Sequence, residues 1–135
     1  MSKTLFVNLP VHDLTSSVEF FTRLGFTPDP NASGADSARL LVSDTCSVML
    51  HRADAFRRFT NTDVTDTSKH REVIVGVSVD DRSDVDDLVR RALEAGGTDL
   101  GPAVDDGFLY MRAFRDLDGH QWSFLHMNYA AFGQA

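Results

Sequence analysis

The chain has 135 residues and a formal net charge of −7 at pH 7, with 42% hydrophobic and 24% charged residues. This length and composition are typical of one folded globular domain and exclude disordered and fibrous classes. The acidic balance disfavours nucleic acid and anionic membranes as partners. No apolar stretch reaches the roughly 18 residues of a membrane span. A single cysteine, Cys46, fits a reducing compartment, so we expect a cytoplasmic protein.

The first half of the chain predicts a strand, a helix and then two further strands. Residues 4–11 are rich in Leu, Phe and Val and predict a strand, after which Asp13 can cap a helix. Apolar residues recur at i, i+4, i+7 and i+10 from Leu14, and Gly25 is placed to end that helix. The remaining predicted elements are a loop at 28–36, strands at 37–42 and 46–51 joined by a turn at 43–45, and a helical turn at 53–59.

The second half repeats this order. Residues 72–79 predict a strand, Asp81 or Ser83 can cap the helix that follows, and Gly96 is placed to end it. The other predicted elements are a polar irregular linker at 60–69, strands at 108–114 and 121–127 bridged by a turn at 116–119, and a tail at 128–135. Each half thus runs from a strand through a helix to further strands, and we expect the order βαβββ to occur twice by internal duplication.

Two motifs recur in a known group of proteins. One is FVNLPVHDL at residues 6–14, followed by Ser17, the Phe20-Phe21 pair and Leu24-Gly25-Phe26, and the other is FRDLDGHQW at residues 114–122. With these motifs the chain resembles the vicinal oxygen chelate superfamily, which contains glyoxalase I, bleomycin resistance proteins and extradiol dioxygenases.

The resemblance covers nearly the whole chain and implies its fold and assembly. The implied fold is α+β, with two βαβββ modules whose curved sheets surround a cavity. The implied domain is single and spans residues 1–135, with module one at about 1–60 and module two at about 70–128. Members of the superfamily are commonly homodimers, and we expect the same here.

The resemblance also places the positions of a metal site. In metal-dependent members, four side chains, usually His, Gln or Glu, bind one divalent ion that holds two adjacent substrate oxygens. Alignment of the motifs places three of these positions at Phe6, Ile74 and Ser123, and the fourth near Met49. None of these four is a good ligand for such an ion. We therefore expect no metal and no other cofactor, which speaks against glyoxalase, dioxygenase and metal-dependent fosfomycin-resistance chemistry.

Strand alternation selects the residues that we expect to line the cavity. Phe6 and Asn8 share one face of their strand, and Tyr110 and Arg112 share one face of theirs. Arg112 is suited to an anion, and Tyr110 to a hydrogen bond or to stacking on an aromatic ligand. No catalytic residue is assigned. The predicted ligand-binding set is Phe6, Asn8, Met49, Tyr110, Arg112, Ser123 and Leu125.

Two histidines at strand ends leave more than one function open. His51 shares a strand face with Met49, whereas His126 shares one with Trp122 and Phe124. We predict that His51 is a surface residue and that the protein binds a small organic molecule without the usual metal. One alternative is a metal-dependent lyase, similar to lactoylglutathione lyase, or a dioxygenase whose displaced ligands include His51 or His126. Another alternative is a structural or regulatory protein that binds no small molecule.

Overall fold

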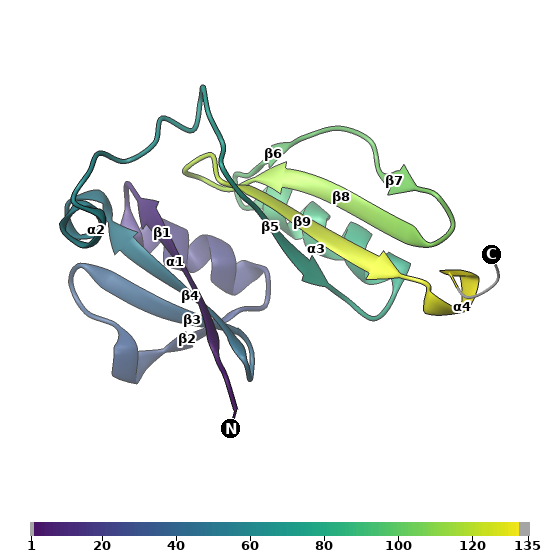
Figure 1. Cartoon of the computed structure of the whole chain (residues 1–135), viewed down its shortest axis with the longest axis horizontal. Helices are drawn as coiled ribbons and strands as arrows, with labels where there is room; N and C mark the ends of the chain where they lie inside the picture. The colour runs from purple at the N-terminus through teal and green to yellow at the C-terminus, as the bar shows by residue number, and fades with distance from the viewer. Residues whose placement is uncertain (1, 133–135) are drawn as a thin grey trace. The chain divides into compact units, whose positions relative to one another are not determined.

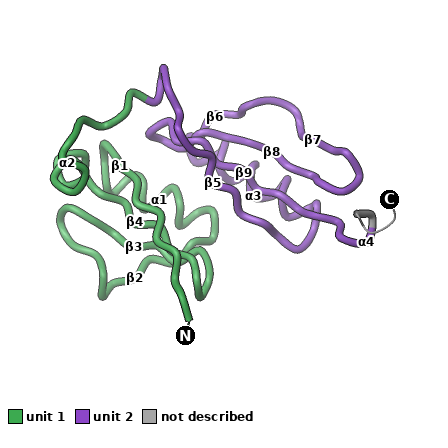
Figure 2. Tube along the Cα trace, in the orientation of Figure 1, with its two compact units in different colours: residues 1–66 green, residues 67–135 purple. Residues whose placement is uncertain are grey.

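The chain divides into two compact units, Met1–Asp66 and Thr67–Ala135 (Figure 2). The computed structural model describes residues 2–132. Each unit contains one β-sheet with a helix packed on one face, so the predicted α+β class is confirmed. Within the described range, none of the helices is long and apolar enough to cross a membrane.

The first unit follows the βαβββ order and ends with an additional helix. Its sheet has the strand order β1-β4-β3-β2, in which β1 runs parallel to β4 and the other pairs are antiparallel. Helix α1 begins where Asp13 Oδ1 accepts the backbone N–H of Ser16 at 3.1 Å, and the chain leaves it through Gly25 at φ 90°. The elements are β1 (Leu5–Val11), α1 (Leu14–Arg23), β2 (Thr27–Asp29), β3 (Ser37–Ser43), β4 (Cys46–Arg52) and α2 (Ala53–Thr60) (Figure 1).

The loop predicted at 28–36 is wrong in part. Strand β2 takes up its beginning and pairs with β3, and Pro30–Ala32 then forms one turn of 3₁₀ helix. The strand order places β2 at the edge of the sheet, and an edge strand tolerates Pro28 because one of its two sides has no hydrogen-bonding partner. A proline at the start of a polar segment therefore did not exclude a strand.

The second unit repeats the path of the first. Its sheet has the order β5-β9-β8-β6, with β5 parallel to β9, and β7 also pairs with β8. The repeated βαβββ order is thereby confirmed, with the short strand β7 as an addition in the second unit. The two-residue strands β6 and β7 were not predicted, and neither was α4, which forms part of the expected tail. The elements are β5 (Ile74–Ser78), α3 (Arg82–Glu94), β6 (Thr98–Asp99), β7 (Val104–Asp105), β8 (Leu109–Arg115), β9 (Gln121–Met127) and α4 (Tyr129–Phe132).

Each sheet buries one face against its helix. Helix α1 packs on β3 and β4, and helix α3 packs on β8 and β9. Asp81 occupies the position before α3, but its side chain makes no capping hydrogen bond, so burial rather than a cap holds this helix. The side chains buried at these two interfaces include Phe20, Phe21, Leu40, Val48 and Leu50 in the first unit and Val85, Val89, Phe114, Trp122 and Phe124 in the second.

A buried carboxylate holds the turn between β8 and β9. Asp116 is only 4% exposed, and its Oδ1 accepts the backbone N–H groups of Asp118 and His120 at 2.9 and 3.0 Å. Its Oδ2 accepts Trp122 Nε1–H at 3.0 Å. Burial raises the pKa of Asp116, while His120 and these three donors act in the opposite direction. Gly119 completes the turn at φ 84°, a conformation that favours glycine.

We predict that Asp116→Ala lowers the free energy of unfolding by about 3 kcal/mol, because three donors lose their acceptor and one of them is the buried indole. Urea unfolding followed by far-UV circular dichroism measures this change. Asp44→Ala, in the exposed turn between β3 and β4, is the matched control and leaves the unfolding curve almost unchanged. Equal stability of the two variants would contradict this role for Asp116.

Candidate functional site

The face of the first sheet opposite α1 carries a cluster of polar side chains. The strand register pairs Asn8 of β1 with Met49 of β4, and His51 of β4 with Ser37 of β3. Paired residues point to the same side of a sheet, so these four side chains share one face. We call this surface the open face of the first sheet.

His51 joins three strands at this face. Its Nε2 lies 2.8 Å from Asn8 Oδ1, and its Nδ1 lies 2.6 Å from Ser37 Oγ. The imidazole ring centroid lies 6.2 Å from that of Phe56 and 5.2 Å from that of Phe59, both on α2. His51 is only 4% exposed, so its predicted surface position is wrong. The physical reason is that α2 packs on β4 and β1 and covers the end of the strand.

Burial also sets the charge of His51. Removal of the ring from water disfavours the imidazolium and lowers the pKa of His51 from its ordinary value of 6.5. The ring is therefore neutral at pH 7. A neutral imidazole has one N–H donor and one acceptor nitrogen, which is what two hydrogen-bonding neighbours of different kinds require.

A pocket of about 300 Å³ opens beside this histidine. Its size is at the lower end of the roughly 300–1,000 Å³ range of small-molecule sites. Helix α2 supplies three lining residues and the open face supplies two, and none of the five carries a charge at pH 7. The arrangement suits a small, uncharged molecule with a flat apolar part. The lining residues are Asn8, His51, Phe56, Phe59 and Thr60.

A larger hollow, of about 610 Å³, lies over α1, β2 and the segment that leads to β3. Its lining is mainly apolar and includes only one titratable side chain, that of Glu19. None of the predicted site residues contributes to it. It offers surface area without a set of converging functional groups, so we place the candidate site at His51.

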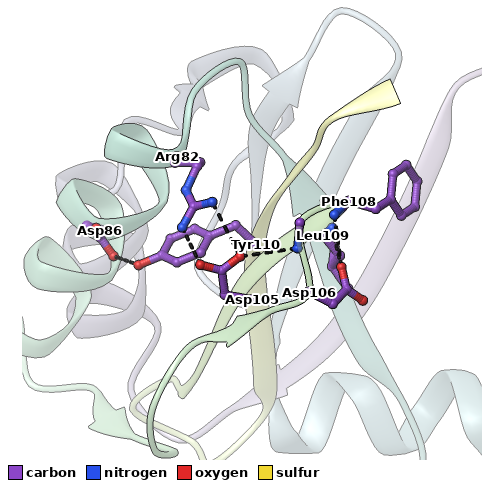
Figure 3. A network of polar contacts seen from close by, with 8 residues as sticks. Arg82, Asp86, Asp105, Asp106, Phe108, Leu109 and Tyr110 are labelled. Carbon is purple, nitrogen blue, oxygen red and sulfur yellow. Dashed lines mark hydrogen bonds and ion pairs between the residues drawn. The ribbon is translucent and has the colours of Figure 1, made fainter. Parts of the chain in front are cut away.

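Tyr110 and Arg112 lie on the helix side of the second sheet. The register pairs Arg112 with Phe124, whereas Ser123 pairs with Ala113, so Arg112 and Ser123 point to opposite faces. Tyr110 O–H donates to Asp86 Oδ1 on α3 at 2.7 Å (Figure 3). These two predicted ligand-binding residues therefore do not share a face with Ser123 and Leu125.

The Tyr110 hydroxyl and the Arg112 guanidinium, which were expected to contact a ligand, instead contact other side chains of the protein. Arg112 lies 3.7 Å from Asp86 and 3.8 Å from Asp99. Arg82 pairs with Asp105, and its guanidinium carbon lies 4.3 Å from the centre of the Tyr110 ring (Figure 3). The hydrogen bond to Asp86 raises the pKa of Tyr110, so the phenol remains protonated. This network ties α3 to β7 and β8.

The four side chains at the aligned metal positions do not fit a divalent ion. Met49 and Ser123 occupy equivalent register positions, because each pairs with the residue two places after the first-strand position of its module. Phe6 and Ile74 have no donor atom, and a thioether and a hydroxyl are weak donors for such an ion. Within residues 2–132, no three His, Cys, Asp or Glu side chains gather closely enough to hold a metal.

Sequence reasoning missed Arg39, which lies on the open face beside Phe6. Its guanidinium carbon lies 4.8 Å from the centre of the Phe6 ring, and its Nε donates to Ser47 Oγ at 3.0 Å. It also pairs with Asp29 at 3.4 Å. Alternation along β3 was the available signal, since Ser37 and Arg39 alternate with buried apolar residues.

A family model decides the assignment of this fold. The model described as Glyoxalase/Bleomycin resistance protein/Dioxygenase superfamily matches residues 4–124. The chain belongs to this superfamily. The resemblance inferred from the two sequence motifs is thereby confirmed. No curated protein matches the chain closely enough to count as a relative.

Several solved structures share the fold of this chain. A hypothetical protein, SA1046 from S. aureus, is 27% identical with a TM-score of 0.79, over 93% of this chain and 94% of that one. A glyoxalase/bleomycin resistance protein/dioxygenase family enzyme from Burkholderia phytofirmans PsJN is 15% identical with a TM-score of 0.80, over 94% and 100%. TioX from Micromonospora sp. ML1 is 27% identical with a TM-score of 0.63, over 94% and 100%.

The lowered pKa of His51 predicts that folding stability falls on acidification. In the unfolded chain, His51 binds a proton near its ordinary pKa of about 6.5, whereas in the folded chain it binds this proton only at a lower pH. The contribution of neutral His51 to folding stability is therefore fully present above about pH 6.5. It is lost as the pH falls from there toward the pKa of His51 in the folded chain. Urea unfolding at about pH 7.5 and pH 5.5 measures the loss, which becomes smaller in His51→Gln.

The control for this prediction is His70→Gln, because His70 is exposed in the segment that precedes β5. This variant keeps the difference in stability that the wild type shows between the two pH values. An unchanged difference in His51→Gln would show that the protonation of His51 is not linked to folding.

Proposed function

We propose that this superfamily member binds a small organic molecule in the pocket beside His51, without the metal ion that other members use. The observation that carries the proposal is the lining of the pocket, in which the rings of Phe56 and Phe59 lie beside His51 and Asn8 supplies a second polar group. Aromatic walls with a few placed polar groups are the usual composition of small-molecule sites. The proposal also fits a superfamily that includes bleomycin resistance proteins.

The aligned metal positions support metal-independent binding. Phe6 and Ile74 cannot coordinate an ion, because their side chains carry no donor atom. Ser123 is 3% exposed, so its hydroxyl, which is a poor donor for such an ion, is also hardly accessible from solvent. Binding of a small molecule in the pocket of the first unit does not require any of these residues to coordinate a metal.

The setting that we propose is a cytoplasmic homodimer with a small molecule as its partner. The net charge of −7 supports the absence of nucleic acid among the partners. The single cysteine supports a reducing compartment. The alternative of a metal-dependent lyase or dioxygenase has less support, because the hydrogen bond of His51 Nε2 to Asn8 would have to break before that nitrogen bound an ion.

We predict that protein purified without an affinity tag, incubated with Mn, Fe, Ni or Zn salts and then dialysed, retains far less than one ion per chain by elemental mass spectrometry. In a screen of aromatic fragments by NMR, hits shift the signals of His51 and Phe56 equally with and without EDTA. The physical reason is that a hydrophobic pocket with hydrogen-bonding groups needs no ion to hold an uncharged ligand.

Phe59→Ala tests the position of the ligand. Phe59 is 76% exposed, so its truncation removes one wall of the pocket without opening the core, and fragment binding weakens. Leu117→Ala, at an exposed apolar residue in the second unit, is the matched control and leaves fragment binding unchanged. One tightly held ion per chain, or fragment binding that EDTA abolishes, would overturn the proposal.

A further inference from the structure

The hydrogen bonds of His51 fix which nitrogen carries its proton. A carboxamide oxygen only accepts hydrogen bonds, so the contact of 2.8 Å with Asn8 Oδ1 requires that His51 Nε2 donate. The neutral ring then has its lone pair at Nδ1, which accepts the hydroxyl hydrogen of Ser37 at 2.6 Å. The chain of donors therefore runs in one direction, from Ser37 through His51 to Asn8.

Among residues 2–132, this direction leaves the amide nitrogen of Asn8, an exposed residue, without a protein acceptor. Asn8 lines the pocket, and its oxygen is held by His51, so the NH₂ end of the same amide is held in a fixed orientation. Across residues 2–132, the only hydrogen bond of the Asn8 side chain is the one to His51. The pocket therefore contains an oriented N–H donor that a ligand oxygen can satisfy.

The other polar groups of the pocket are already used. Thr60 Oγ1 donates to the carbonyl oxygen of Thr62 at 3.1 Å and accepts its N–H at 3.3 Å. His51 Nε2–H is directed at Asn8, so this nitrogen has no lone pair with which to take a proton from a bound molecule. The geometry therefore supports hydrogen bonding to an acceptor rather than proton abstraction by His51.

The charge of the pocket selects among acceptors. The five lining residues include no Lys or Arg, and the lowered pKa of His51 keeps its ring neutral at pH 7. A carboxylate would lose hydration here without a cation among the lining residues to replace it, which is costly. A neutral carbonyl oxygen loses less hydration free energy, and a hydrogen bond from the Asn8 amide compensates for that loss.

We infer that the Asn8 amide selects the ligand, and that the ligand is an uncharged planar molecule whose carbonyl oxygen accepts an N–H of Asn8 while its ring packs against Phe56 and Phe59. This inference rests on the proposed function, because it assigns a chemical class to the molecule bound in the same pocket. Asn8 is thus the specificity-determining residue of the site, and His51 and Ser37 are positioning residues that act through it.

Three probes of similar size test this assignment: acetophenone, benzoate and isopropylbenzene. They present a neutral carbonyl, a carboxylate and no acceptor, respectively. NMR titration at pH 7, following the Asn8 side-chain amide and the Phe56 and Phe59 rings, measures each affinity. We expect the full-length protein to bind acetophenone about tenfold more tightly than isopropylbenzene, which corresponds to one well-formed hydrogen bond, and more tightly than benzoate.

Variants at Asn8 separate the hydrogen bond from the rest of the pocket. In Asn8→Ala the affinity for acetophenone falls to that for isopropylbenzene, whose own affinity is unchanged. Asn8→Asp retains an acceptor for His51 but lacks the amide donors, so it also loses the preference for acetophenone over isopropylbenzene. This variant provides the test if the alanine variant does not fold. Asn31→Ala, at an exposed position in the same unit, is the matched control and keeps the preference.

The outcomes distinguish this inference from the proposed function. Equal binding of acetophenone and isopropylbenzene, tighter binding of benzoate, or a preference that survives in Asn8→Ala and Asn8→Asp would overturn the role of Asn8 while the pocket remained a binding site. If none of the probes shifted the Phe56 and Phe59 signals, the pocket would not bind such molecules, and the proposed function would fail with the inference.

Discussion

Strand alternation, with its period of two residues, is the constraint on which the rest of the structure depends. It assigns each strand residue either to the face that a helix buries or to the opposite face. In the first sheet, the parallel register of β1 and β4 brings Asn8 close to His51, and the antiparallel register of β3 and β4 brings Ser37 to the same histidine. A shift of one residue in either pairing would move these groups to the buried face.

Much of the fold follows from local sequence signals. The helix after Asp13 and the long hairpins of both units combine strong periodicity with capping or turn residues, and they form where the sequence predicts them. Short elements carry too little periodicity to be recognised, as with β6, β7 and the edge strand that contains Pro28. The repeated module was also accessible, because the order of elements in the two halves agrees even though they share few identical residues.

The site was less accessible to sequence reasoning, for two physical reasons. Alternation shows which residues share a strand face, but the face that a helix covers depends on packing, and Arg112 lies under α3 although its charge indicated an open cavity. The burial of His51 depends on α2, whose direction after β4 no local pattern specifies. Alternation with Phe6 places Asn8 on the open face, where it lines the pocket, although its partner His51 was expected at the surface.

The proposed site requires His51 to be a neutral ring that donates from Nε2 and accepts at Nδ1, because this state orients Asn8 toward the pocket. Long-range ¹H–¹⁵N correlation NMR of the uniformly labelled protein at pH 7 tests this directly, since protonated and unprotonated ring nitrogens have well-separated chemical shifts. We predict a protonated Nε2 and an unprotonated Nδ1 for His51. A proton on Nδ1 alone, or a proton on both nitrogens, would contradict it.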